Sequence, residues 1–187
     1  MRRVTYAMSV SLDGYIVDAG GNFDWGEPDA QVFRFWIDQT RKVGVHLLGR
    51  RLYETMLYWE TAEQDHSLSS AEQEWTALWL GLPKVVFSTS LTAVQGNARL
   101  AAGGLAEEIT CLRSERAGGD IAIGGATLAA AAADLGLIDE YHVMVYPVLV
   151  GGGTPFFPQH ERRVDLALIE TRTFGAQVVW MRYQVTR

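Results

Sequence analysis

Two apolar segments of this chain each end in a glycine turn that opens into a helical pattern. Residues 43–48 run into Gly49, and residues 120–123 run into Gly124 and Gly125. A buried strand, a tight turn and a helix in succession form the repeating unit of a parallel sheet, so this pattern constrains the fold strongly. It also constrains function, because free N–H groups and the positive end of the helix dipole both face whatever lies over such a turn.

Strand-like and helix-like segments alternate along the first 135 residues. Strands are expected at 4–16, 43–48, 84–88 and 120–123, and helices at 28–40, 50–58, 70–82, 104–116 and 126–135. We interpret 61–69 as an exposed loop, and Ser70 with Gln73 as a capping box at the start of a helix. After Asp139 the pattern is mostly β, with strands expected at 141–150, 166–171 and 177–184. The order predicts a single α/β domain over residues 1–187, with a mostly parallel sheet completed by antiparallel C-terminal strands.

Charge and cysteine content exclude several classes of protein. The 187 residues carry a formal net charge of −6, which disfavours general binding to nucleic acid or to acidic membranes. The single cysteine excludes an internal disulfide and a cysteine metal cluster, and it suits a cytoplasmic protein. No apolar run approaches the ~20 residues that span a bilayer. The histidines lack metal-ligand spacing, and His46 and His142 are interpreted as structural because they lie in apolar strands.

The paired glycines Gly124 and Gly125 would let a pyrophosphate approach the main chain closely. A tight strand-to-helix turn without a ligand explains the same pair equally well. The segment is not the three-glycine fingerprint of dinucleotide-binding Rossmann domains, so that fold gains no direct support.

Arg50 and Arg51 strengthen the interpretation as a phosphate site. An arginine in the first turn of a helix is unfavourable beside the positive dipole end, and a bound phosphate would compensate for it. A salt bridge to Glu54 or to a surface carboxylate is the alternative. Ser88 and Thr89 end a third strand, where their hydroxyls could hold a ribose phosphate or cap a loop. Three such strand ends predict one extended site for a dinucleotide.

Five short motifs together resemble one known family. They are Ser9 to Ile16 (SVSLDGYI), Leu48 to Glu54 (LGRRLYE), Val86 to Ser88 (VFS), Ile123 to Ala126 (IGGA) and Pro147 to Gly153 (PVLVGGG). Their order and spacing cover nearly the whole chain. The chain thereby resembles the dihydrofolate reductase superfamily, in the branch that contains the reductase domain of the bifunctional riboflavin biosynthesis protein (the RibD C-terminal domain family). The resemblance implies a three-layer α/β/α fold that binds NADPH and passes a hydride to a small heterocycle.

The match also implies where the cofactor lies. The pyrophosphate is expected along Gly124, Gly125, Ala126 and Thr127. The phosphates are expected near Gly49 and Arg50, and the adenosine ribose phosphate near Ser88 and Thr89. Arg50 or Arg51 would favour NADPH over NADH, because only NADPH carries a 2′-phosphate for a guanidinium to bind.

The substrate side of the resemblance is less complete. Asp13 lies in the segment between cofactor and substrate, and it could contact substrate or hold the turn through backbone hydrogen bonds. Trp25 could stack on a flat ring or anchor its loop to the core. Dihydrofolate reductases carry a carboxylate on the first helix, and an ungapped match places Phe33 there, with Asp29 and Asp38 nearby but unmatched. Folate reduction is therefore not expected.

The resulting expectation is an NADPH-dependent reductase of a small heterocycle, resembling 5-amino-6-(5-phosphoribosylamino)uracil reductase. Two alternatives stay open: a reductase of the same fold that acts on a pterin, quinone or xenobiotic, and a nucleotide-binding protein without catalysis. No metal site is expected. The family and the aromatic-rich composition also predict a homodimer.

Overall fold

The computed structural model describes residues 1–65, 67–116, 118–157, 163–175 and 177–186. The strands of the main sheet are β1 (Val4–Ser11), β3 (Val43–Gly49), β4 (Lys84–Phe87), β5 (Ala98–Leu100), β6 (Asp120–Gly124), β7 (Glu140–Tyr146), β9 (Leu166–Thr173) and β10 (Val179–Val185). A small second sheet pairs β2 (Tyr15–Val17) with β8 (Thr154–Pro155). The helices are a 3-10 turn η1 (Asp24–Gly26), α1 (Ala30–Thr40), α2 (Arg50–Met56), α3 (Tyr58–Asp65), α4 (Ser70–Gly81), α5 (Leu105–Ser114) and α6 (Ala126–Asp134).

The main sheet has the strand order β5-β4-β3-β6-β1-β7-β10-β9. Neighbouring strands from β5 to β7 pair in parallel, whereas β10 runs antiparallel to both β7 and β9. The long alternation of strand and helix accounts for the parallel part, because parallel strands need a crossover connection. The predicted mixed sheet with antiparallel pairing at its C-terminal end is confirmed.

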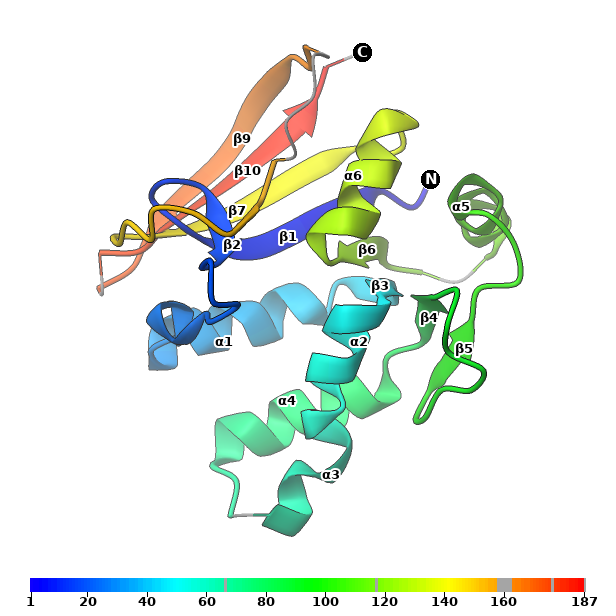
Figure 1. The fold of residues 1–187 in the computed structure, drawn as a ribbon, viewed down its shortest axis with the longest axis horizontal. Coiled ribbons are helices and arrows are strands. Elements are labelled where there is room, and N and C mark those ends of the chain that lie inside the picture. Colours follow the sequence, from blue (N-terminus) through cyan, green and yellow to red (C-terminus); the bar gives the residue numbers. More distant parts are fainter. Residues whose placement is uncertain (66, 117, 158–162, 176, 187) are drawn as a thin grey trace.

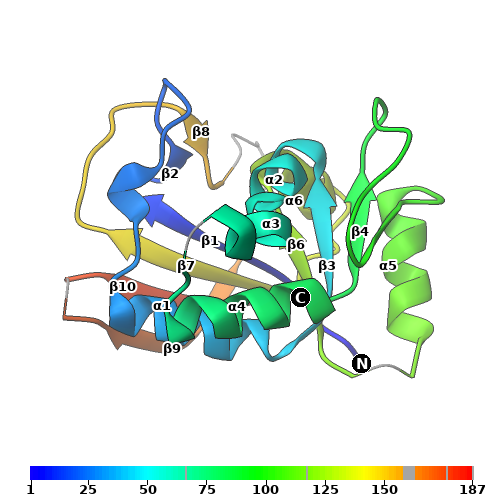
Figure 2. The same cartoon turned by 90° about the horizontal axis from the view of Figure 1, so that it is seen from below.

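Helices cover both faces of the sheet (Figures 1 and 2). On one face α5 and α6 pack against a core cluster that contains Tyr6 and Ile123, and this cluster is the largest that the described residues form. On the other face α1 packs over β7 and β10 through Phe35, while α4 packs over β3 and β4 through Trp79. The alanine-rich surface of α6 allows the helix to approach the sheet closely, as the sequence predicts. The three-layer α/β/α architecture is confirmed.

Some elements differ from the sequence-based prediction. The segment expected as the loop 61–69 contains most of α3, which packs on α4. The capping box lies one residue earlier than predicted: the Ser69 side chain accepts from the backbone N–H of Glu72, and the Glu72 side chain accepts from that of Ser69. The short edge strands β5 and β8 were not predicted. None of the helices built from the described residues is both long and apolar enough to cross a membrane.

One irregularity of the sheet determines where a ligand can enter. β1 pairs with β7 from Thr5 to Ser11, but it pairs with β6 only from Val4 to Tyr6. Beyond the Tyr6–Ile123 pair, β1 and β6 separate toward their carboxyl ends. Open α/β sheets bind ligands at such a separation of neighbouring strands.

Candidate functional site

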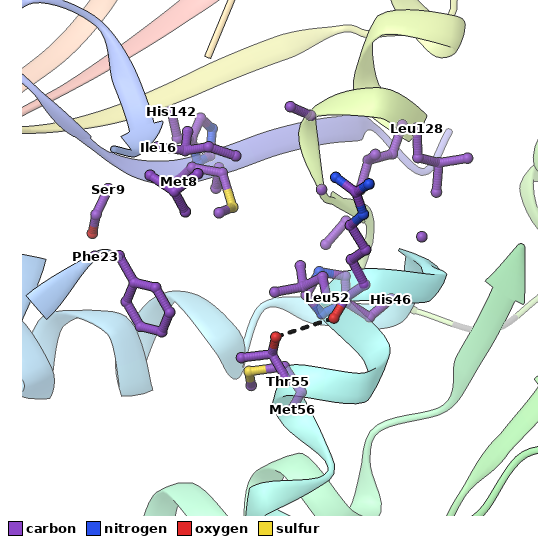
Figure 3. Close-up of a pocket in the computed structure, with 18 of the residues that line it drawn as sticks. Met8, Ser9, Ile16, Phe23, His46, Leu52, Thr55, Met56, Leu128 and His142 are labelled. Atoms are coloured by element: carbon purple, nitrogen blue, oxygen red, sulfur yellow. Dashed lines mark hydrogen bonds between the residues drawn. The ribbon is translucent and has the colours of Figure 1, made fainter. Parts of the chain in front are cut away.

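A cavity of about 1390 Å³ occupies the gap between β1 and β6. Its walls include Met8 and Leu128, which pack on the face that carries α5 and α6. They also include Ser9 and His142, which lie on the opposite face: Ser9 is in register with Met144, a core residue beneath α1, and His142 precedes Met144 by two residues. The cavity therefore passes from one face of the sheet to the other. Figure 3 shows side chains from these separate elements around a common space.

Most of the predicted cofactor residues line this one cavity. They are Gly49, Arg50, Arg51, Gly125, Ala126 and Thr127. They come from the starts of α2 and α6, which follow the neighbouring strands β3 and β6. The fold thus brings together two glycine turns that are separated by about 75 positions in the sequence, as expected for the carboxyl ends of adjacent parallel strands.

Gly125 is the N-cap residue of α6 and has a conformation that requires glycine. Its φ is +96° and its ψ is 131°, a region that side chains with a Cβ rarely adopt. Among the described residues no side chain caps α6 at this end, so its first-turn N–H groups are available to an anion in the cavity. This arrangement can bind a pyrophosphate through the backbone.

Gly124 has a different role from its neighbour. It is buried and is not part of the cavity wall. A Cβ at Gly124 would lie 2.6 Å from Leu52 Cδ2 and 2.9 Å from both His46 Nε2 and Leu48 Cδ2. Glycine is needed here because α2 and β3 pack directly against the backbone, so Gly124 sets the position of the turn from behind. Contact with pyrophosphate at Gly124 stays a prediction.

The two arginines of α2 differ in their partners. Arg50 Nη1 lies 3.3 Å from Glu54 Oε1, the salt bridge that the sequence offered as an alternative. Both side chains of this pair are nearly half exposed, so the pair stabilises the helix only weakly. For the Arg51 guanidinium, no hydrogen bond or ion pair is present within the described part of the chain. Both arginines line the cavity and can bind a phosphate.

Ser88 and Thr89 lie beside the main cavity rather than in it. They line a smaller hollow of about 450 Å³ together with Phe87, Ser90 and Arg50. Arg50 and Phe87 also line the main cavity, so the two spaces are contiguous. The Ser88 hydroxyl accepts hydrogen bonds from the backbone N–H groups of Ser90 and Leu91, which gives it the loop-capping role that was the alternative interpretation.

The two residues predicted on the substrate side lie in different surroundings. Asp13 accepts hydrogen bonds from the backbone N–H groups of Val150 and Gly151, at 3.2 and 2.7 Å, and does not line the cavity. Trp25 lines the cavity and also packs edge-on against Tyr146, with 6.1 Å between ring centroids. Trp25 thus anchors the loop to the core and presents a face to the ligand space, whereas Asp13 ties two loops together. Substrate contact by either residue stays a prediction.

The first helix contributes no carboxylate to the cavity. Phe33 packs against Trp75, with 6.0 Å between ring centroids. Asp29 is the N-cap of α1 and accepts hydrogen bonds from the N–H groups of Gln31 and Val32. The α1 residues that line the cavity are Trp36, Gln39 and Thr40. The acid that protonates a pterin in dihydrofolate reductases therefore has no counterpart on this wall.

The two histidines interpreted as structural from the sequence pack against core tryptophans, His46 against Trp79 and His142 against Trp180, and both also line the cavity. Burial, reinforced by the nearby Lys84 charge, lowers the pKa of His46 to about 4, so this imidazole is neutral near pH 7. Burial also lowers the pKa of His142, although Glu140 partly offsets the effect. The position of His142 in the cavity could be recognised only together with its partner on the neighbouring strand. His142 is in register with Ala7 on β1, and the small side chain of Ala7 leaves space above the sheet.

A network of charged side chains lines the end of the cavity that lies near the amino-terminal ends of β1 and β7. Glu140 accepts hydrogen bonds from both Arg182 Nε and Nη2, at 2.9 and 3.0 Å, and from Arg3 Nη1 at 2.9 Å. Its Oε2 also lies 3.0 Å from His142 Nε2. Burial would raise the pKa of Glu140, but these hydrogen bonds and the arginine charges outweigh it and hold the pKa at about 2. Glu140 is therefore ionised at neutral pH.

Known proteins share both the sequence pattern and the fold. The sequence is 30% identical to YyaP of Bacillus subtilis (strain 168) over 183 residues, which are 97% of this chain and 94% of that protein. A putative riboflavin biosynthesis protein from Shewanella sp. PV-4 has the same fold, with a TM-score of 0.78 and 24% identity over the whole of both chains. Dihydrofolate reductase from Enterococcus faecalis, solved with NADP(H), aligns with a TM-score of 0.62 and 13% identity over 99% of this chain and 97% of that chain.

The family match extends over nearly the whole sequence. Residues 2–180 match the RibD C-terminal domain. The fold and the family predicted from the motifs are both confirmed. This chain belongs to the RibD C-terminal domain family.

Proposed function

We propose that this protein is an NADPH-dependent reductase of a small heterocyclic substrate. The observation that carries the proposal is the single cavity through the sheet. One end of it has an uncapped helix N-terminus behind a glycine at positive φ, together with two arginines, and its middle has aromatic and aliphatic walls. A phosphate-binding end joined to an apolar middle is the arrangement that a nicotinamide dinucleotide and a flat second ligand require.

The residues present fit the cofactor. The first-turn N–H groups of α6 would hold the pyrophosphate, with Thr127 and Arg51 beside it. Arg50 lies between the main cavity and the hollow at Ser88 and Thr89, where it would bind the ribose 2′-phosphate. When bound, NADPH supplies the hydride, and the accompanying proton comes from solvent or from a group in the cavity.

Binding and turnover can be tested separately. NADPH titration should quench the fluorescence of the six tryptophans, of which Trp25, Trp36, Trp75 and Trp79 line the cavity, and should raise the melting temperature. Absence of both effects would refute the proposal. Binding without turnover of any pterin, pyrimidine or quinone would favour a nucleotide-binding protein without catalysis.

A matched pair of glycine substitutions distinguishes an effect on cofactor binding in the cavity from the general effect of backbone strain. Gly125→Ala and Gly136→Ala both place a Cβ on a residue with positive φ, +96° and +65°. Both should destabilise the fold by about 1–3 kcal/mol, because each forces a Cβ into a backbone conformation that favours glycine. Only Gly125→Ala should weaken NADPH binding, because only Gly125 lines the cavity.

A further inference from the structure

The middle of the cavity has walls suited to a flat ring. Met8 and Ile16 line one side of this space, Phe23 lies across from Leu52, and Met56 closes another side (Figure 3). We call this space the central lobe. It lies between the phosphate-binding end at Gly125 and the charge network at Glu140.

Phe23 has an unusual exposure for a residue in such a wall. Its side chain lines the cavity, yet 55% of its surface is accessible. A large aromatic ring that is left uncovered beside an open cavity provides a stacking surface at low entropic cost. The opposite walls are aliphatic and thioether side chains, which pack well against a ring face.

The charges that border the central lobe compensate one another. Arg182 and Arg3 are both bound to Glu140, and Arg3 also lies 3.5 Å from Asp120. Arg182 also lies 3.8 Å from Glu170, so two cations face three carboxylates. His46 and His142 add no charge near pH 7, because burial lowers the pKa of each.

Among the residues that the structure describes, the remaining cations of the cavity lie at its rim. Lys42, Arg50 and Arg51 are all exposed, and the two arginines are at the end assigned to the cofactor. Transfer of a phosphate or carboxylate from water into the central lobe would thus cost free energy, without a free cation from the described part of the chain to offset it.

The central lobe does offer a hydrogen bond to a neutral ligand. Because Glu140 is ionised and can only accept, His142 Nε2 must donate its proton to the carboxylate. The neutral imidazole then has Nδ1 as an acceptor, to which no residue in the described part of the chain donates. An N–H or O–H on the edge of a ring is the complementary group.

We propose that the second ligand of this site is an uncharged, planar, conjugated ring without a phosphate or carboxylate. The inference rests on the proposed reductase function and narrows its substrate class. It separates this chain from reductases whose pyrimidine substrate carries a phosphorylated ribosyl group.

Matched pairs of ligands that differ by one charged group test this inference. Suitable pairs are 1,4-naphthoquinone with its 2-sulfonate, pterin with pterin-6-carboxylate, and a ribosylaminouracil with its 5′-phosphate. Binding is measured by tryptophan fluorescence in the presence of NADP⁺, and kcat/KM is measured by NADPH consumption. In at least one pair the neutral member should bind about tenfold or more tightly than the charged one, and in no pair should the charged member be preferred.

A preference for the charged members, or equal affinity within every pair, would overturn the inference. So would a protein that binds NADPH but none of the rings. Failure to bind NADPH would instead overturn the proposed function, so the two failures are distinguishable.

A charge introduced into the central lobe provides a second test. Met56→Arg places an unpaired cation in the wall, whereas Met56→Gln has a similar length and no charge. Met56→Arg should shift the binding ratio of each pair toward its charged member by about tenfold, and Met56→Gln should leave the ratio unchanged. NADPH binding by both variants verifies that they are folded, and an unshifted ratio in a folded Met56→Arg variant contradicts the inference.

Discussion

The imidazole of His46 lies against the Cα of Gly124, so that a Cβ at position 124 would approach His46 Nε2 to 2.9 Å. The contact joins β3 to β6 directly beneath the turn that opens α6. We expect Gly124→Ala to destabilise the protein by about 1–3 kcal/mol through overpacking and to displace the turn. Denaturant unfolding measures the first effect and NADPH titration the second. The double variant Gly124→Ala/His46→Ala should recover part of the lost stability. An equal loss of unfolding free energy in the single and the double variant would contradict the packing argument.

Arg51 should contribute to cofactor affinity. Its guanidinium lines the cavity and has no partner among the described residues, so a phosphate can bind it without breaking an ion pair. We expect Arg51→Ala to raise the Kd for NADPH about tenfold or more, the loss of one charge-assisted hydrogen bond. Arg50→Ala should reduce the preference for NADPH over NADH. Arg116→Ala, which removes an exposed arginine outside the cavity, is the control. An equal increase in the Kd for NADPH with all three substitutions would indicate that only the overall positive charge of the protein matters.

Glu140 should make stability depend on pH in the acid range. Its pKa is lowered from the ordinary 4.5 to about 2, so its contribution is complete above pH 4.5 and is lost as pH falls through 2. We expect Glu140→Gln to destabilise the protein by about 3 kcal/mol at neutral pH, because it leaves Arg182 and Arg3 without their shared carboxylate. Urea unfolding between pH 2 and 7 should show a shallower acid decline for the variant. Parallel curves for the two proteins would contradict this.

The outer edge of the sheet gives the predicted homodimer a testable location. β9 is the last strand of the sheet, and its Leu168 and Ile169 are 55% and 46% exposed. A long apolar edge strand of this kind favours pairing with another chain. We expect sedimentation to report a species of about twice the 20.7 kDa chain mass, and Ile169→Lys to convert it to monomer. Leu80→Lys, at an exposed apolar residue of α4, should leave the mass unchanged. A wild-type monomer would refute the homodimer.

The sequence predicted those strands and helices whose local pattern of apolar residues agrees with their burial in the fold. The runs before Gly49 and Gly124 form strands because they are largely buried, and within them only His46 interrupts the apolar pattern. β5 was missed because three residues are too few to show a period, and the strand is held by its ladder to β4 and by packing of Ala98 and Leu100 on the core cluster around Trp79. α3 was missed because its composition is polar and its packing on α4 cannot be read locally.

The same distinction applies to the site. Gly125 was identifiable because a turn at positive φ favours glycine, which can be read directly from the sequence. His142 was not, because a histidine within an apolar strand looks the same whether it packs in the core or lines a cavity. Its role depends on Ala7 beside it, on Glu140 two residues earlier and on Arg182 of β10, which the chain brings together only in the folded state.

The position of β1 between β6 and β7 has a consequence for how the chain reaches its native state. Val4 pairs with Ile121, and Thr5 pairs with Glu140, so β1 is synthesised before β6 and β7 and must wait for both neighbours. Contacts of such long sequence separation slow folding, because the intervening loop must close first. Until residues 120–146 have been synthesised, β1 remains an unpaired apolar segment that is prone to aggregation. Expression at low temperature or with chaperones should therefore raise the yield of folded protein more than substitutions at its surface.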